Sequence, residues 1–349
     1  MSDPATLYAQ GREFLDSSSP LECIGLLTPL LGQQNEAQPE YLAVYQLLGE
    51  AFLEAGDPQN AYELFSTCAQ LDADGLQGGI EKFLWLGQLT GGRDGEVWYE
   101  KGIKGLKTEI NNLTSSNNNT SSIEEELKLK KVKLCEALCG MVEIWMTDLC
   151  MEPEAEARCE ALITESLMVN DTHPESWSVL GSIRISQQRN DDARSALQKS
   201  WDLYHAQIAA TESDLDYAQL LPALIRLAQN MFEMQQLEQT VQVTAEINRL
   251  DDEIPEPYYL HGLARFELYK QLRAQNLPRK AARQVAGARE AWEHLLKLAQ
   301  MDGENLDPEL VPTVTEHLKE LPQVTQDDYT SSEEEIDDLE LDDVENLQG

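Results

Sequence analysis

The chain has 349 residues, of which 42% are apolar, enough material for one large or two ordinary domains with a buried core. It carries 63 acidic against 26 basic residues, a formal net charge of −37 at pH 7, so its surface repels nucleic acid and anionic lipid and attracts cationic partners. We find no run of about 18 apolar residues and no basic-then-apolar leader, and therefore expect neither a membrane span nor a signal peptide.

Apolar residues recur at i, i+3, i+4 and i+7 through the body of the chain, and strand patterns are almost absent. The sequence therefore predicts an all-α protein whose helices are separated by short breaks. The cysteines fall within these apolar helical patterns, which predicts reduced, buried thiols in a cytosolic or nuclear protein. They are Cys23, Cys68, Cys135, Cys139, Cys150 and Cys159.

Two segments share one helix–turn–helix pattern. In the stretch 45–70, "YQLLGEAFLEAGDPQNAYELFSTCAQ", Gly49 lies on the first helix and Ala61 on the second. In the stretch 177–200, "WSVLGSIRISQQRNDDARSALQKS", Gly181 and Ala193 fall at the same spacing. The glycine lets the two helices approach closely, and the alanine leaves room for a bulky side chain. One hairpin cannot bury its apolar face alone, so such units are expected to stack.

This pattern resembles the tetratricopeptide repeat. The resemblance implies an α-solenoid of about seven helical hairpins over 1–326, with an irregular helical bundle as the alternative. Only the interval from Ala228 to Gly262 equals the family period of 34 residues, which predicts insertions elsewhere. The small residue that marks each unit recurs at Gly11, Gly49, Gly87, Gly140, Gly181, Ala228 and Gly262.

Two stretches interrupt the repeats. The polar segment "NNLTSSNNNTSS" predicts a disordered loop at about 111–122. At about 270–290 a first helix runs past the usual length, breaks near Pro278 and resumes, which predicts an inserted helical region. This region holds the densest positive charge, and we expect its bases to pair with neighbouring acids or with the C-terminal tail; a nucleic-acid patch is the alternative. The bases are Lys270, Arg273, Arg279, Lys280, Arg283 and Arg289.

The sequence shows no catalytic constellation. The glycine-rich stretch "TGGRDGE" has no strand before it and is expected to turn the chain. The five histidines are scattered, without an H-E-x-x-H motif. Cys135 and Cys139 share a helical face as a metal pair would, but no second pair at zinc-ligand spacing follows. We therefore expect no enzyme, no cofactor and no metal site.

In the tetratricopeptide family, the ligand faces the second, fifth, ninth and twelfth positions of each first helix. On this chain the resemblance implies an acidic and aromatic groove for a basic, extended guest, although some of these positions face the core in the alternative interpretation. The implied client-binding residues are Glu50, Glu81, Leu84, Glu175, Ser178, Ile225, Phe232, Glu256, Tyr259 and Phe266. The Lys and Asn residues of the co-chaperone carboxylate clamp are replaced by Gln46, Glu50, Ser178 and Ser182, which disfavours that role.

The C-terminal segment 327–349 is strongly acidic. Between Asp327 and Glu345, eleven of nineteen residues are Asp or Glu and none is basic, which predicts an acidic disordered tail. Thr330, Ser331 and Ser332 each precede a Glu by three residues, the context that acidophilic kinases favour. We expect phosphorylation there to deepen the negative charge.

The whole chain resembles the fungal acidic assembly chaperones of large-subunit ribosomal protein four, on the strength of "YQLLGEAF", "WSVLGSI" and "SSEEEIDDLELDD". The resemblance implies a dedicated chaperone that holds this newly made, basic protein in its groove and delivers it to pre-ribosomes. It also implies a protein of cytoplasm and nucleus that meets nuclear import factors through its client, without binding nucleic acid or membrane directly. A scaffold or adaptor subunit of a transcription or quality-control complex and an acidic histone chaperone remain alternatives.

Overall fold

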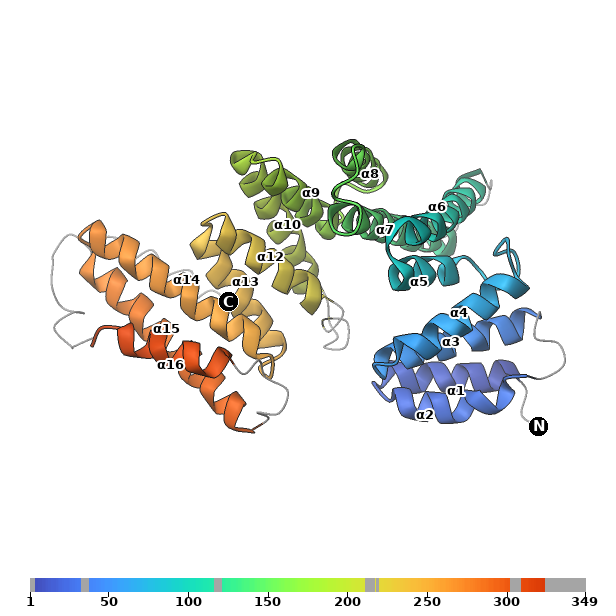
Figure 1. Cartoon of the computed structure of the whole chain (residues 1–349), viewed down its shortest axis with the longest axis horizontal. Coiled ribbons are helices and arrows are strands. Elements are labelled where there is room, and N and C mark those ends of the chain that lie inside the picture. Colours follow the sequence, from blue (N-terminus) through green and yellow to red (C-terminus); the bar gives the residue numbers. More distant parts are fainter. Residues whose placement is uncertain are drawn as a thin grey trace. The chain divides into compact units, whose positions relative to one another are not determined.

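The computed structural model describes residues 4–32, 38–115, 121–210, 217, 220–301 and 309–323. Within these ranges the regular secondary structure is entirely helical, with fifteen α-helices and one short 3-10 helix (Figure 1). The all-α prediction is confirmed. None of the helices in the described ranges is long and apolar enough to cross a membrane.

The chain divides into two compact units, Met1–Val179 and Leu180–Gly349, and the boundary falls inside α9. The prediction of a single superhelix over 1–326 therefore stays a prediction. The first unit contains α1 (Pro4–Asp16), α2 (Pro20–Leu27), η1 (Thr28–Leu30), α3 (Pro39–Glu54), α4 (Pro58–Leu71), α5 (Glu81–Thr90), α6 (Gly92–Ser115), α7 (Ser121–Met146), α8 (Ala155–Val169) and the start of α9 (Pro174–Ser186). The second unit contains the rest of α9, α10 (Asn190–Ala210), α12 (Leu221–Glu233), α13 (Leu237–Leu250), α14 (Pro255–Ala274), α15 (Pro278–Met301) and α16 (Leu310–Glu320).

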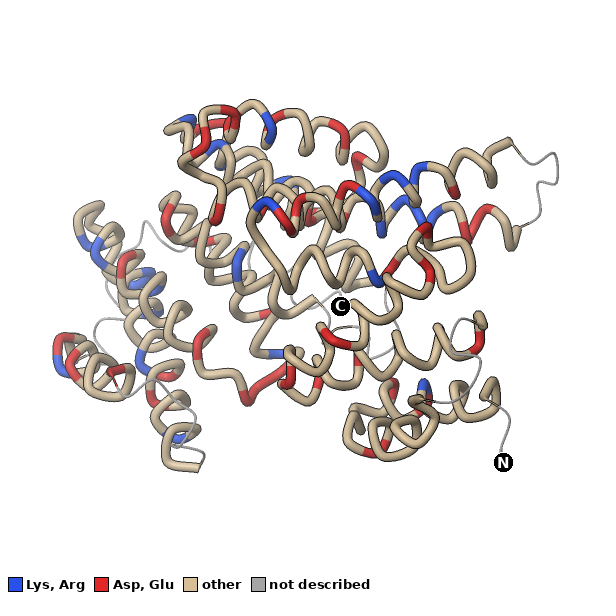
Figure 2. Tube along the Cα trace, turned by 45° about the vertical axis from the view of Figure 1, so that its right-hand side comes forward, with Lys and Arg blue, Asp and Glu red and all other residues tan. Residues whose placement is uncertain are grey.

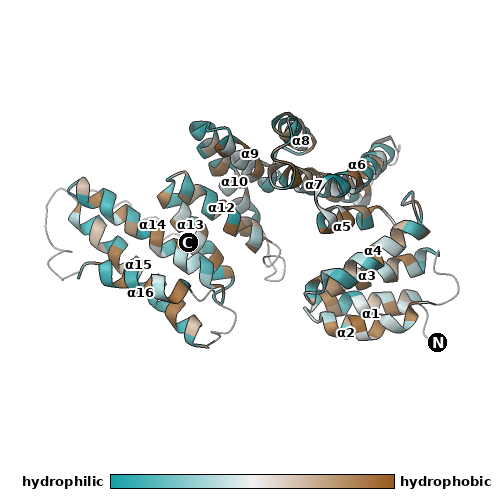
Figure 3. Cartoon of the chain, in the orientation of Figure 1, coloured by the Kyte–Doolittle hydropathy of each residue, from teal (hydrophilic) through white to brown (hydrophobic). Residues whose placement is uncertain are grey.

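These helices pair in sequence order as antiparallel hairpins. Each of the seven predicted marker residues lies on the first helix of a pair, from α1–α2 to α14–α15, so the predicted hairpins are confirmed. A last helix, α16, packs against α15. Most helices carry both apolar and polar residues, as amphipathic helices do when one face packs on a neighbour (Figure 3).

The glycines of the two quoted segments lie at close helix–helix contacts. A Cβ atom at Gly49 would lie 2.6 Å from Cζ of Phe65 on the paired helix, and one at Gly181 would lie 2.6 Å from Cδ2 of Leu197. Ala61 and Ala193 are fully buried. The sequence interpretation of these small residues is confirmed, because a larger side chain would push the paired helices apart.

Several of the hairpin turns share one geometry. Gly56 has φ of +77°, Gly56 N–H donates to Leu53 O and Asp57 N–H donates to Phe52 O. The same left-handed conformation occurs at Gln188, Gln235 and Asn276, none of which is glycine. A left-handed residue closes the end of a helix and sends the chain back, so these turns set the antiparallel pairing.

The cysteine prediction is correct at five positions and wrong at one. Cys23, Cys68, Cys135, Cys139 and Cys159 are buried and unbridged. Cys150 is exposed, because it lies in the turn after α7 ends at Met146, beyond the buried face of that helix.

The loop predicted at about 111–122 is shorter than expected. Helix α6 continues to Ser115 and α7 begins at Ser121, while 116–120 lie outside the described residues. The helical apolar spacing of Leu106 and Ile110 continues at Leu113, inside the polar segment. Composition alone therefore places the start of this loop too early.

The predicted helical break near Pro278 is confirmed. Residues 270–274 end α14, and α15 begins at Pro278. The region at about 270–290 is therefore the turn end of one long hairpin, α14–α15, and not a separate inserted helix. Pro278 stands at the start of α15, where its missing N–H costs no hydrogen bond.

Candidate functional site

The groove residues that the resemblance implies belong to different units. Glu50, Glu81, Leu84 and Glu175 lie in the first unit. Phe232, Glu256, Tyr259 and Phe266 lie in the second unit.

Glu50 on α3 is engaged by a base of its own unit. Its Oε2 atom accepts a hydrogen bond from Arg12 NH2 at 2.9 Å, and both side chains are part-exposed. Burial raises the pKa of the neighbouring Glu54 carboxyl, and the Glu50 charge raises it further. A cationic guest would find two carboxylates here but would have to share Glu50 with Arg12.

Glu81 at the start of α5 ties this helix to α7. Lys133 Nζ donates to Glu81 Oε1 at 3.0 Å, and Lys130 Nζ lies 3.7 Å from the same atom. Burial alone would raise the pKa of Glu81, but the two lysines outweigh it and the pKa is lowered. This carboxylate is already neutralised by the fold, which weakens its case as a contact for a basic guest.

The other groove residues of the first unit face neighbouring helices. Leu84 packs against the backbone of α6 at Gly102. Glu175 is half-buried on α9, and its charge helps burial to raise the pKa of Tyr99 and of Cys139. Ser178 is buried, which contradicts its predicted place on an open surface.

Phe266 is also buried, with 8% of its surface exposed. Its ring meets Trp292 edge-to-face at 6.0 Å and stacks on Tyr269 at 6.1 Å. Its predicted exposure in the groove is therefore wrong. The twelfth position of this long helix packs on the apolar face of α15.

Tyr259 and Glu256 are accessible on α14. Tyr259 is half-buried, with its ring 6.2 Å from that of His317 on α16. Glu256 is exposed and accepts a hydrogen bond from Gln229 Nε2 at 2.6 Å. Phe232 and Ile225 on α12 are half-buried and pack on the core of the second unit.

A polar strip joins three first helices of the second unit and adds two residues, Gln229 and Asn230, that the sequence interpretation did not name. Asn230 Nδ2 on α12 donates to Ser182 Oγ on α9 at 2.9 Å. Gln229 on α12 donates in turn to Glu256 on α14. We define the polar strip as Ser182, Gln229, Asn230 and Glu256. Three consecutive first helices thus present hydrogen-bonding groups side by side, as recognition of an extended polypeptide requires.

The family's ligand-facing positions include three of the four strip residues, Ser182, Gln229 and Glu256. Gln229 directly follows the marker residue Ala228 and falls on the ninth, ligand-facing position of its helix, whereas Asn230 is one position further on. The hydrogen bonds span 48 and 27 residues of sequence, and no local pattern predicts such pairs.

Cys135 and Cys139, which share a helical face, are part of the core. Cys135 Sγ donates to Ser166 O at 3.4 Å, and Cys139 Sγ lies 3.7 Å from Ser176 Oγ. Burial raises the pKa of both thiols. Across the described ranges, no group of three or more His, Cys, Asp or Glu side chains is arranged to hold a metal ion.

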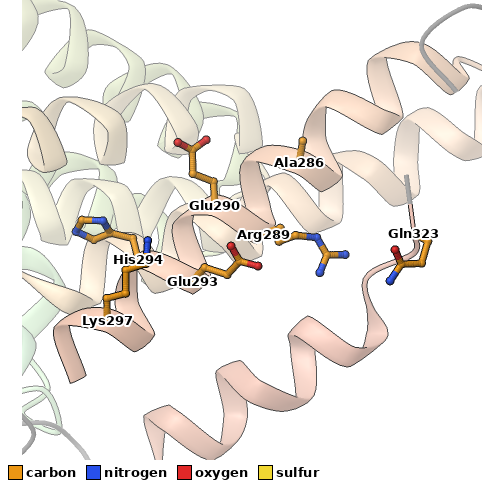
Figure 4. Close-up of a pocket in the computed structure, with 7 residues that line it drawn as sticks. All are labelled: Ala286, Arg289, Glu290, Glu293, His294, Lys297 and Gln323. Carbon is orange, nitrogen blue, oxygen red and sulfur yellow. The ribbon is translucent and has the colours of Figure 1, made fainter. Parts of the chain in front are cut away.

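Two surface hollows lie beside these elements, one in each unit. One of about 350 Å³ lies in the first unit, between α6, α7 and α8. The other, of about 460 Å³, lies along α15 in the second unit and is lined by Ala286, Arg289, Glu290, Glu293, His294, Lys297 and Gln323 (Figure 4). The predicted phosphorylation sites Thr330, Ser331 and Ser332 lie outside the described residues.

No protein-family model matches the chain. Two curated relatives are both named "Probable assembly chaperone of rpl4". The one from Emericella nidulans is 30% identical over 268 residues, which cover 74% of this chain and 64% of the relative. The one from Schizosaccharomyces pombe is 32% identical over 222 residues, covering 62% of this chain and 61% of the relative. The matched region thus spans less than two thirds of the length of either.

A solved structure extends this similarity to the fold. It is titled "Assembly Chaperone of RpL4 (Acl4) (Residues 1-338)" and superposes with a TM-score of 0.67 at 31% sequence identity. The superposition covers 79% of this chain and the whole of that one. On this similarity in sequence and structure, the chain belongs to the family of the assembly chaperones of rpl4.

Proposed function

We propose that this protein is a dedicated chaperone for the large-subunit ribosomal protein rpl4. It holds the newly made, strongly basic client and delivers it to pre-ribosomes during large-subunit biogenesis. The observation that supports this most is the 31% identity maintained over the whole length of the solved Acl4 chain. The names of the two curated relatives agree with it.

The charge of the chain supports the same proposal. A net charge of −37 attracts a basic polypeptide over a distance of about a Debye length and speeds their encounter. The polar strip offers Glu256 as a charged contact and Gln229, Asn230 and Ser182 as neutral ones. Tyr259 adds an aromatic surface on the same helix, against which the apolar stem of a lysine or arginine packs.

The proposal includes a cellular route. The protein takes up its client in the cytoplasm and releases it in the nucleus, where RNA offers a higher density of negative charge. Import factors are met through the client. The role is non-enzymatic, in keeping with the chaperone names of the relatives.

Affinity purification of the tagged full-length protein at moderate salt, followed by mass spectrometry, tests the proposal. Recovery of rpl4 at near-equal stoichiometry is the expected result. Recovery of core histones instead would favour the histone-chaperone alternative. A set of transcription or quality-control proteins without any basic client would favour the scaffold, and either result would overturn the proposal.

A charge reversal then tests the polar strip. Glu256→Lys places a positive charge where a basic client would lie, and we expect it to weaken client binding about tenfold. Glu238→Lys is the matched control, because both residues are exposed acids in the first turn of their helices. Equal loss of affinity in both variants would show that only net charge matters and that the strip is not the contact site.

A further inference from the structure

The turn end of the α14–α15 hairpin is a basic surface in an acidic protein. Between Leu268 and Arg289 the chain has six Lys or Arg residues and no Asp or Glu. Elsewhere in the described chain Lys and Arg are interspersed with acids, as Figure 2 shows for the long helices α6 and α7. We define the basic hairpin end as Arg273, Arg279, Lys280, Arg283 and Arg289.

Three members of the basic hairpin end, Arg273, Arg283 and Arg289, form no ion pair with the residues that the structure describes. Neighbouring Lys270 pairs with Glu267 at 2.7 Å, as the sequence predicts. Arg273 and Arg283 are exposed, and neither has an ion-pair partner among the residues that the structure describes. Arg289 donates to a backbone oxygen, Pro322 O at 3.2 Å, which does not cancel its charge. These three guanidinium groups therefore keep their positive charge for an anionic partner.

The orientation of α15 adds to that potential. Its first turn contains Arg279 and Lys280 and no acid. A helix N-terminus carries a partial positive charge, so acidic residues normally stabilise the first turn and basic residues destabilise it. Here the partial positive charge of the helix N-terminus and the positive charges of the side chains add rather than cancel. The arrangement is unfavourable by itself and becomes favourable when an anionic group covers it.

The segment before the acidic tail is fixed to this same hairpin. Leu321 is buried in a cluster with Val285 and Trp292 of α15. Pro322 accepts the hydrogen bond from Arg289, and Gln323 lines the hollow along α15 opposite Arg289 (Figure 4). The chain thus leaves the described structure directly beside the basic hairpin end.

The acids that follow are within reach. Asp327 follows Gln323 by four positions, a span of up to about 13 Å when extended. Along α15, Arg283 lies about 9 Å and Arg279 about 15 Å from Arg289, at 1.5 Å per helical residue. A tether this short gives the tail an effective concentration on the order of millimolar at the surface, so weak ion pairs suffice.

We propose that the acidic segment 327–345 docks on the basic hairpin end of its own chain. Its eleven carboxylates pair with the arginines and the lysine there and complement the N-terminus of α15. In this position the tail shields the molecule's densest positive patch from nucleic acid. Phosphorylation at Thr330, Ser331 or Ser332 would add charge next to these arginines and tighten the contact.

Zero-length crosslinking of the full-length protein with a carbodiimide, read by mass spectrometry, tests this. The reagent joins a carboxylate to a lysine amine only when the two are in contact. Amides from 327–345 are expected at Lys280, and also at Lys270 and Lys297 of the same hairpin. The exposed lysines Lys104, Lys128 and Lys199 serve as comparators. Crosslinks shared evenly among all six, or absent at Lys280, would overturn the proposal.

Two controls sharpen the result. The pair Arg273→Gln/Arg283→Gln is expected to reduce the Lys280 crosslink about fivefold, through the loss of two exposed charge contacts. The pair Arg189→Gln/Arg249→Gln changes net charge equally at exposed sites of the same unit and should leave the crosslink unchanged. Equal effects from both pairs would contradict a specific site.

In a mixture of isotopically labelled and unlabelled protein, crosslinks between the two forms would mean that the tail binds a second copy instead.

Discussion

The Nζ atom of Lys82 lies 2.8 Å from Oδ2 of Asp72, and both side chains are withdrawn from solvent. Asp72 also accepts hydrogen bonds from the backbone N–H groups of Leu76, Gln77 and Gly78. These contacts join the end of α4 to the start of α5. The ion pair and these hydrogen bonds thus hold a turn that has no regular secondary structure. Both carboxylate oxygens of Asp72 have hydrogen-bond partners.

Removing one partner of this pair should be costly. We expect Lys82→Met to lower the free energy of unfolding by about 3–5 kcal/mol, because it leaves a buried carboxylate without its counter-charge. Urea unfolding at pH 7 measures this. Lys128→Met, at an exposed position of α7, is the control and should stay within about 0.5 kcal/mol of the unaltered protein. Similar values for both variants would show that the pair contributes nothing.

Two buried histidines predict a loss of stability in mild acid. Burial lowers the pKa of His173 to about 4. Burial, with the charge of Arg265, lowers the pKa of His261 to about 3. His261 is held neutral by geometry as well, since Arg265 Nε donates to its Nε2 at 2.6 Å.

Between these values and the unfolded pKa of about 6.5, the unfolded chain binds more protons than the folded one. The contribution of these two histidines to the free energy of unfolding is therefore complete above about pH 6.5, and it is lost as the pH drops toward 4. We expect His173→Gln to be less stable than the unaltered protein at pH 7 and to lose less stability between pH 7 and 5. Urea unfolding at the two pH values measures the difference. Equal pH slopes would contradict the assignment.

Replacing the left-handed glutamines of two turns by glycine should increase stability. Gln188 and Gln235 both have φ of +59°, where glycine carries no steric penalty and glutamine does. Each substitution to glycine should raise the free energy of unfolding by about 0.5–1 kcal/mol. Thermal unfolding checks this. The reverse change, Gly56→Gln at φ of +77°, should lower the melting temperature, and a neutral result there would contradict the explanation.

Helix packing predicts opposite effects at two glycines. Gly49→Ala places a Cβ atom against the Phe65 ring and should cost about 1–3 kcal/mol. Gly25→Ala lies in α2, where nothing comes within 4 Å of the added Cβ. It should be neutral or stabilise by up to about 1 kcal/mol, because alanine favours the helix. Equal changes in chemical denaturation would refute the close-contact explanation.

The sequence by itself determined the hairpins. The spacing from Gly49 to Ala61 and from Gly181 to Ala193, and the helical break near Pro278, are local features. Helix periodicity and turn chemistry act over a few residues, so a single sequence contains them. The same applies to the acidic composition, and the resemblance built on these features led to the correct family.

Only the tertiary structure decided which faces stay open. Phe266 is buried against Trp292 on the next helix. Glu81 accepts a hydrogen bond from Lys133, which lies 52 residues later in the chain. The polar strip likewise depends on partners from three separate helices. Helical periodicity gives the direction in which a side chain points, but not what packs there. The exposure and charge of a side chain are set by neighbours that only the folded chain brings together.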